Sequence, residues 1–386
     1  MLKFFVALLF CVIACSSNVL AQYKLLHQDA EMSRAIRLGL HHVYNFEFDK
    51  AQPYFLEIKK KYPQHPAFAF SQALVLFTKN FPMKPGHPDY KLFESHVKEC
   101  LEKAMTILEK DPKNADGLFC ALSANSYQAL MHSFSKDYLQ AVNSARKAYG
   151  FIKQGFAIKK EYPDFYYSSG MFYYYAKQYP ETHPMAKPLM VFFEDGNKEK
   201  GLNDLNISML RGIYTKQESM MLLSYLYVKY ENKPAKSLEY SEKFYYNYPQ
   251  NPFAIARYIE GLILTQEYAK AEDLLPKLRQ SSSDFFRVFA EVYGAILEEK
   301  FNKRKDLAKQ HYLIALQMCA ALHHKTDDLQ SFCYLGLGRI ADAARDRKNA
   351  VLYYRKALDL AEYESVKKEC KQRLQQNGQM ANRHAK

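Results

Sequence analysis

Small and aromatic residues recur along this chain at intervals typical of paired helices. Between Met32 and Pro63, Gly39 is followed twelve positions later by Ala51 and one turn after that by Phe55. Two helices approach closely only where a small residue removes side-chain bulk, and a large ring one turn further on fills the widening gap. Pro63 then ends the second helix. The pattern predicts an antiparallel helical hairpin.

The same spacing returns near the C-terminus. Gly338 and Ala350 are again twelve residues apart, and Tyr354 and Ala357 follow. A copy that begins at Pro252 carries Ala271 at the small position of its second helix. Other copies are looser, and each closes on a proline: Asp111-Pro112, Tyr162-Pro163 and Tyr248-Pro249. By this count the chain contains six to eight hairpins.

These residues resemble the tetratricopeptide repeat (TPR) family, whose unit of 34 residues is a pair of antiparallel helices. The resemblance covers residues 31–362 and implies an all-α fold, a right-handed superhelical solenoid of helical hairpins. It also implies a non-catalytic protein that holds a partner on its concave face. The residues to which it assigns repeat packing are Gly39, Ala51, Phe55, Pro63, Ala271, Gly338, Ala350, Tyr354 and Ala357.

Three segments depart from the repeat. Residues 78–89 are too rich in proline to be helical, so we expect a loop inserted within the second hairpin. Across residues 164–212 the register fades, and an irregular hairpin is expected. Residues 363–386 are expected to form a capping helix followed by a disordered tail.

The N-terminus has the features of an export signal. Residues 1–21 combine Lys3, an apolar run of about 11 residues and a small-residue cleavage pattern, with 22–30 as a short linker. The run is shorter than the roughly 20 residues that a membrane-spanning helix needs. A lipobox-like pattern that ends at Cys15 is the alternative, with Cys15 lipidated as a membrane anchor. Both patterns predict a location in the periplasm or at the outer membrane.

Five cysteines follow this segment, and none forms a CxxC pair. An odd number in a long chain does not suggest a disulfide framework, so buried thiols are expected. The alternative is a bridge on successive helices, either Cys100 with Cys120 or Cys319 with Cys333.

The net charge of +13 suggests an anionic partner, but Lys and Arg are scattered among Asp and Glu. Without a recognition motif, nucleic-acid binding is not expected. His41-His42 and His323-His324 lack the spacing of three or four that a chelating helical pair needs, so no metal site and no cofactor are expected. Gly-rich phosphate loops and nucleophile motifs are also missing, so no catalytic residue is predicted.

Tyrosine is unusually frequent, with 31 copies and no tryptophan. Runs such as 172–175 place aromatic rings on nearly every face of a helix, so some rings should be exposed for recognition. In family register, the residues that fall on the concave face are Tyr167, Tyr174, Lys177, Lys229, Glu260, Arg339 and Asp342.

The sequence therefore predicts a protein-binding scaffold of the bacterial cell envelope that engages a peptide or protein. The alternative is an envelope receptor for a small ligand, in which tyrosines stack on the rings of a glycan. An enzyme with its chemistry in the irregular centre is a third reading.

Overall fold

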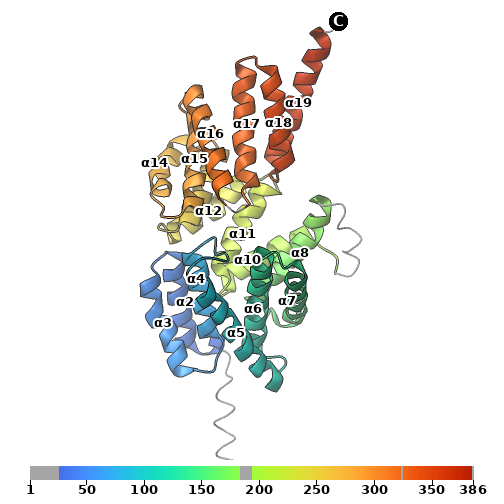
Figure 1. Ribbon diagram of the computed structural model, residues 1–386. Coiled ribbons are helices and arrows are strands. Elements are labelled where there is room, and N and C mark those ends of the chain that lie inside the picture. The colour runs from blue at the N-terminus through green and yellow to red at the C-terminus, as the bar shows by residue number, and fades with distance from the viewer. Residues whose placement is uncertain (1–25, 183–193, 323–324, 385–386) are drawn as a thin grey trace, which may run out of the picture. The chain divides into compact units, whose positions relative to one another are not determined.

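The helices expected from the small-residue spacing are present. A computed structural model of the chain describes residues 26–182, 194–322 and 325–384 (Figure 1). Within these ranges the chain forms 17 α-helices and no strand, so the predicted all-α fold of helical hairpins is confirmed. The predicted signal segment and Cys15 lie outside the described residues. None of the described helices is both long and apolar enough to cross a membrane.

The chain divides into two compact units, residues 1–219 and 220–386. In unit 1, the first helices of the hairpins, α2, α4 and α6, contact one another, and the second helices pack against them. The elements of unit 1 are η2 (Leu26–Gln28), α2 (Ala30–Tyr44), α3 (Phe48–Lys61), α4 (Ala67–Lys79), α5 (Tyr90–Lys110), α6 (Ala115–Phe134), α7 (Tyr138–Ile158), α8 (Phe165–Thr182) and α10 (Lys198–Arg211).

Helix α11 (Lys216–Lys229) contains the boundary between the units. In unit 2, α13, α15, α17 and α19 form a layer of neighbouring helices. The elements of unit 2 that follow α11 are α12 (Pro234–Asn247), α13 (Pro252–Leu264), α14 (Tyr268–Arg279), α15 (Asp284–Lys300), α16 (Lys305–Ala321), α17 (Asp327–Ala343), α18 (Arg347–Leu360) and α19 (Glu364–His384).

The repeat residues lie where two helices meet. A Cβ atom built on Gly39 would come within 2.5 Å of Phe55, and one built on Gly338 within 2.6 Å of Tyr354. Each aromatic ring therefore occupies the space that its glycine leaves open. Four further repeat residues have no exposed surface: Ala51, Ala271, Ala350 and Ala357. Pro63 lies just after the end of α3, as expected for a residue that ends a helix.

The turns inside the hairpins share one backbone conformation. Six of them contain a residue other than glycine with φ between 50° and 66°. The next residue donates its backbone N–H to a carbonyl of the preceding helix, as in the bond from Glu47 to His42 of 2.8 Å. This left-handed cap closes the first helix and starts the return. The six residues are Phe46, Lys136, Asn232, Gln266, Lys303 and Arg345.

The segments that depart from the repeat have these structures. Residues 80–89 connect α4 to α5 without a helix, and residues 183–193 between α8 and α10 are not described. Helices α8 and α10 nonetheless pack as a hairpin. Helix α19 runs from Glu364 to His384, within the segment 363–386 expected to hold a capping helix and a tail.

All five cysteines beyond the signal segment are buried free thiols. Cys100 and Cys120 lie on α5 and α6, and the Cys100 Sγ is 3.8 Å from the Cys120 carbonyl oxygen. Cys319 and Cys333 are each at most 2% exposed. Burial raises the pKa of the Cys319 and Cys333 thiols, which keeps both protonated.

Candidate functional site

Unit 1 contains an apolar pocket of about 500 Å³. The first helices of three hairpins, α4, α6 and α8, supply most of its wall, which is the face that the repeat register assigns to partner binding. Ile152 of α7, Asp164 before α8, Tyr214 and Thr215 before α11 and Glu218 in the first turn of α11 complete it. The lining residues are Phe70, Leu74, Phe77, Phe119, Leu122, Ser123, Ser126, Tyr127, Leu130, Ile152, Asp164, Tyr167, Ser168, Met171, Phe172, Tyr175, Tyr214, Thr215 and Glu218.

Aromatic rings pack against one another along the wall. The Tyr214 ring stacks on Phe119, with centroids 5.1 Å apart, and meets Phe70 edge-on at 5.5 Å. The Tyr127 ring lies 5.3 Å from Phe77. Because these rings hold one another in place, the pocket is formed before any ligand enters.

Asp164 fixes the segment that carries Tyr214. One carboxylate oxygen, Oδ1, accepts hydrogen bonds from the backbone N–H groups of Ile213, Tyr214 and Thr215 at 2.8–3.0 Å. The Thr215 hydroxyl donates to the same oxygen at 2.9 Å. Burial raises the pKa of Asp164, and these four donors oppose that shift. Asp164 therefore holds the wall together.

Glu218 places a buried carboxyl oxygen without a hydrogen-bond partner in the pocket. Its Oε2 atom is shielded from solvent and forms no hydrogen bond. Burial raises the pKa of Glu218 to about 8. The residue's own backbone N–H acts in the opposite direction and lowers this pKa by less than burial raises it. A carboxyl held in this way carries a proton at neutral pH and ionises when a cation arrives. Perturbed carboxyls of this kind mark functional sites.

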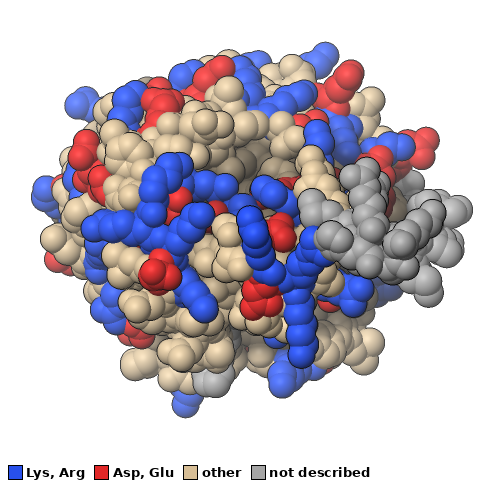
Figure 2. Space-filling view, turned by 90° about the horizontal axis from the view of Figure 1, so that it is seen from above, with Lys and Arg blue, Asp and Glu red and all other residues tan. Residues whose placement is uncertain are grey.

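Charge distinguishes the pocket from the protein surface. Figure 2 shows Lys and Arg side chains interspersed with Asp and Glu over one face, in keeping with the net charge of +13. The described residues that line the pocket include two carboxyl groups and no Lys, Arg or His. A basic protein thus keeps basic side chains away from this apolar surface.

The sequence-predicted residues of unit 1 fall in different places. Tyr167 lines the pocket, where burial raises its pKa to about 12. Tyr174 has no exposed surface because α10 packs over it at Gly201, so it is not the surface residue that the repeat register indicated. Lys177 is exposed outside the pocket lining, and its Nζ is 3.9 Å from Glu181.

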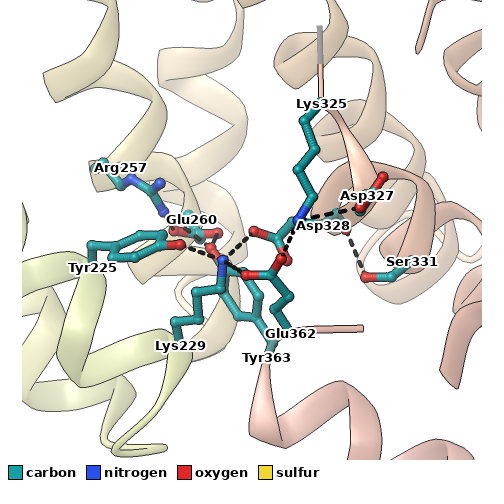
Figure 3. A network of polar contacts seen from close by, with 10 residues as sticks. All are labelled: Tyr225, Lys229, Arg257, Glu260, Lys325, Asp327, Asp328, Ser331, Glu362 and Tyr363. Carbon is teal, nitrogen blue, oxygen red and sulfur yellow. Dashed lines mark hydrogen bonds and ion pairs between the residues drawn. The ribbon is translucent and has the colours of Figure 1, made fainter. Parts of the chain in front are cut away.

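Lys229 and Glu260 are also buried, contrary to the expectation of an open face, and belong to one polar network in unit 2 (Figure 3). Lys229 Nζ is 2.8 Å from Asp328 and contacts Glu362. Burial acts to lower the pKa of Lys229, but Asp328 and Glu362 raise it above its ordinary value. The Glu362 pKa, which burial would raise, falls to about 2 because Lys229 and Lys325 donate to it.

The Glu260 end of this network uses two further partners. Arg257 Nη1 lies 2.6 Å from Glu260 Oε2, and the Tyr363 hydroxyl donates to Glu260 Oε1 at 2.7 Å. Tyr363 is 103 residues from Glu260 along the chain. The network thereby joins α11 and α13 to α17 and to the segment before α19, which is a structural role.

Arg339 and Asp342 hold α17 against its neighbours. Arg339 makes a two-bond ion pair with Glu299, at 2.6 and 2.7 Å. Asp342 accepts hydrogen bonds from Tyr354 at 3.0 Å and Asn377 at 3.2 Å. Both residues also line a polar hollow of about 600 Å³, together with Ala343, Arg345, Arg347, Arg373, Gln376 and Asn377. Because Arg339 is neutralised by Glu299, we take the aromatic pocket as the stronger candidate.

No family model matches the chain. No curated protein matches it either. Among solved structures, it is similar to the C-terminal part of a TPR repeat-containing protein from Cytophaga hutchinsonii, with 13% identity, a TM-score of 0.37, and coverage of 74% of this chain and 97% of that chain. It is also similar to the human IFIT1 dimer with m7Gppp-AAAA, with 12% identity, a TM-score of 0.35, and coverage of 90% and 72%. Similarity at this level supports no conclusion about function.

Glu218 was not singled out in the sequence, because it follows the stretch in which the repeat register fades. The one available signal is its position two residues before the apolar run 220–223. The described residues contain no group of three or more His, Cys, Asp or Glu side chains placed to hold a metal ion.

Proposed function

We propose that this chain is a non-catalytic binding scaffold and that the aromatic pocket of unit 1 receives an apolar portion of a protein partner. One observation carries the proposal: a preformed apolar pocket of about 500 Å³ lies on the first helices of successive hairpins. Its volume is within the range of ligand sites and suits one or two large side chains better than a folded surface. Pockets of this kind anchor the residues that dominate a binding energy.

Binding is better supported than catalysis because the two carboxyls do not work as a pair. Asp164 Oδ1 is occupied by four donors, so Glu218 alone is left to react. Glu218 therefore has no second carboxyl with which to divide the acid and base roles of a catalytic pair.

A small glycan is the second candidate, favoured by the tyrosines that line the pocket. Sugar hydroxyls need many hydrogen-bonding partners, and several of the polar groups here are already engaged. Ser126 donates to the Leu122 carbonyl at 2.9 Å, and Ser168 donates to the Phe165 carbonyl at 3.2 Å. We therefore rank an apolar peptide above a glycan.

The cell-envelope location is part of the proposal and rests on the composition of residues 1–21. The partner would accordingly be another envelope protein. Mass measurement of the mature N-terminus tests this part and distinguishes cleavage before Gln22 from lipidation at Cys15. An uncleaved Met1 would contradict it.

The pocket itself is tested by selection from a random twelve-residue peptide library against the purified protein. Enriched peptides should share apolar side chains and bind in solution. Ser123→Phe should weaken their binding about tenfold or more, because Ser123 lines the pocket and a benzyl group would fill part of it. Ser133→Phe is the matched control, since Ser133 lies on the same helix, is exposed and does not line the pocket.

Failure to enrich any peptide would contradict the proposed function. Equal binding by the wild type and Ser123→Phe would contradict the pocket as its site. A glycan that shifts the melting temperature of the wild type and not of Ser123→Phe would support the second candidate instead.

A further inference from the structure

The unpartnered carboxyl oxygen of Glu218 indicates that the ligand of this pocket carries a polar group. A buried carboxyl oxygen without a hydrogen-bond donor is unfavourable, and in this pocket the other lining side chains offer it none. Asp164 is already satisfied by the segment 213–215. A ligand that forms a polar contact with Glu218 Oε2 therefore removes an unpaired polar atom that the unbound protein carries.

The walls favour a donor that is positively charged. Eight aromatic rings line the pocket, and the faces of such rings attract cations most strongly where water is excluded. The lining contains no cation of its own to compete. The eight rings are Phe70, Phe77, Phe119, Tyr127, Tyr167, Phe172, Tyr175 and Tyr214.

We propose that the group entering this pocket is a lysine side chain, carried by an otherwise apolar segment of the partner. Its methylene stem packs against the rings while its ammonium group reaches Glu218. This inference rests on the proposed function and specifies its ligand.

An ammonium group fits the site better than a guanidinium. A guanidinium pairs best with a carboxylate through two parallel hydrogen bonds. Glu218 presents one fully buried carboxyl oxygen, Oε2, that has no hydrogen-bond partner. A single acceptor matches a compact point charge.

The protonation of Glu218 agrees with this geometry. The raised pKa, about 8, means that the empty pocket holds a neutral carboxyl and avoids a buried charge. Entry of an ammonium group favours the carboxylate, so the proton of Glu218 leaves to solvent as the ion pair forms. Glu218 is thus charged only when the ammonium group of the partner is present to pair with it.

The test begins with the twelve-residue selection repeated on Glu218→Gln. The wild type should enrich lysine flanked by apolar residues, and Glu218→Gln should enrich apolar residues without lysine. The best wild-type peptide is then compared by calorimetry with a copy in which norleucine replaces the lysine. Because norleucine keeps the stem and removes the charge, its affinity for the wild type should be about tenfold lower. The two peptides should bind Glu218→Gln within about twofold of each other.

Apolar peptides without a lysine preference, bound equally by wild type and Glu218→Gln, would overturn this inference and leave the proposed function standing. No peptide binding at all would overturn both. Binding of n-butylamine without binding of any lysine peptide would overturn the assignment to a protein segment. Preference for arginine over lysine in the selected peptides would overturn the choice of ammonium.

Discussion

The ring of Phe55 lies against the α-carbon of Gly39, so that a methyl group built there would come within 2.5 Å of the Phe55 Cε1 atom. Gly338 and Tyr354 repeat the same relationship at the other end of the chain, where the closest approach is 2.6 Å. In both hairpins a glycine is needed because the aromatic ring occupies the position of a Cβ atom, and not because the backbone adopts an unusual conformation. The repeat thus joins one glycine and one ring sixteen residues later.

Gly39→Ala should therefore destabilise unit 1. The added methyl forces the fully buried Phe55 ring to move, and such overpacking costs about 1–3 kcal/mol. Urea denaturation followed by circular dichroism measures the loss. Gly150→Ala is the control, because a Cβ there meets nothing within 4 Å and alanine favours the helix. Equal stability of Gly39→Ala and wild type would contradict the packing.

Lys229→Met should destabilise unit 2 by about 3 kcal/mol or more. The substitution keeps the length of the side chain but leaves the carboxylates of Asp328 and Glu362 without their shared cation in a largely buried network. Lys236→Met removes an exposed pair with Glu239 at 2.6 Å and should cost far less, because solvent screens the pair. Thermal denaturation of the two variants compares them, and similar losses would refute the buried role.

The left-handed turn residues make a separate prediction. Lys303 has φ of 61°, which a β-branched side chain adopts poorly. Lys303→Val should lower stability by about 1–2 kcal/mol, whereas Lys303→Gly should leave it unchanged or slightly higher. The exposed Lys309→Val on α16 is the control and should cost about 0.5 kcal/mol. If valine at 303 costs no more than at 309, the turn does not impose this conformation.

Glu218→Gln should change how stability depends on pH. A carboxyl whose pKa rises from 4.5 when unfolded to about 8 when folded takes up a proton on folding, so stability falls as pH rises between these values. The variant lacks this group, and its urea midpoint should fall less between pH 5 and pH 8. The other titratable groups of the pocket remain in both proteins: Tyr127, Asp164, Tyr167, Tyr175 and Tyr214. Parallel pH profiles would show that Glu218 is ionised in the folded protein.

Much of the fold could be predicted from the sequence because packing at helix crossings restricts residue size. Gly39, Ala51 and Phe55 report this contact directly, since no bulky residue fits at the first two positions. The turn residues gave no such signal. Phe46 and Lys303 adopt a conformation usually marked by glycine or asparagine, and tertiary packing of the hairpin imposes it.

The candidate site was less predictable because counting along one helix does not reveal what packs on it. Tyr167 and Tyr174 are seven residues apart on α8, yet α10 covers only Tyr174. Lys229 finds its partner Asp328 at a distance of 99 residues along the chain, which no local pattern encodes. The repeat register therefore does not show whether a charged residue on a first helix lies on an exposed face or in a buried network.

The central claim is that binding occurs in the aromatic pocket of unit 1, and calorimetry with a selected peptide tests it most directly. The wild type and Ser133→Phe should bind that peptide with equal affinity, and Ser123→Phe should bind it about tenfold more weakly or not at all. Undiminished binding by a folded Ser123→Phe protein would contradict the claim and place the binding site elsewhere on the chain.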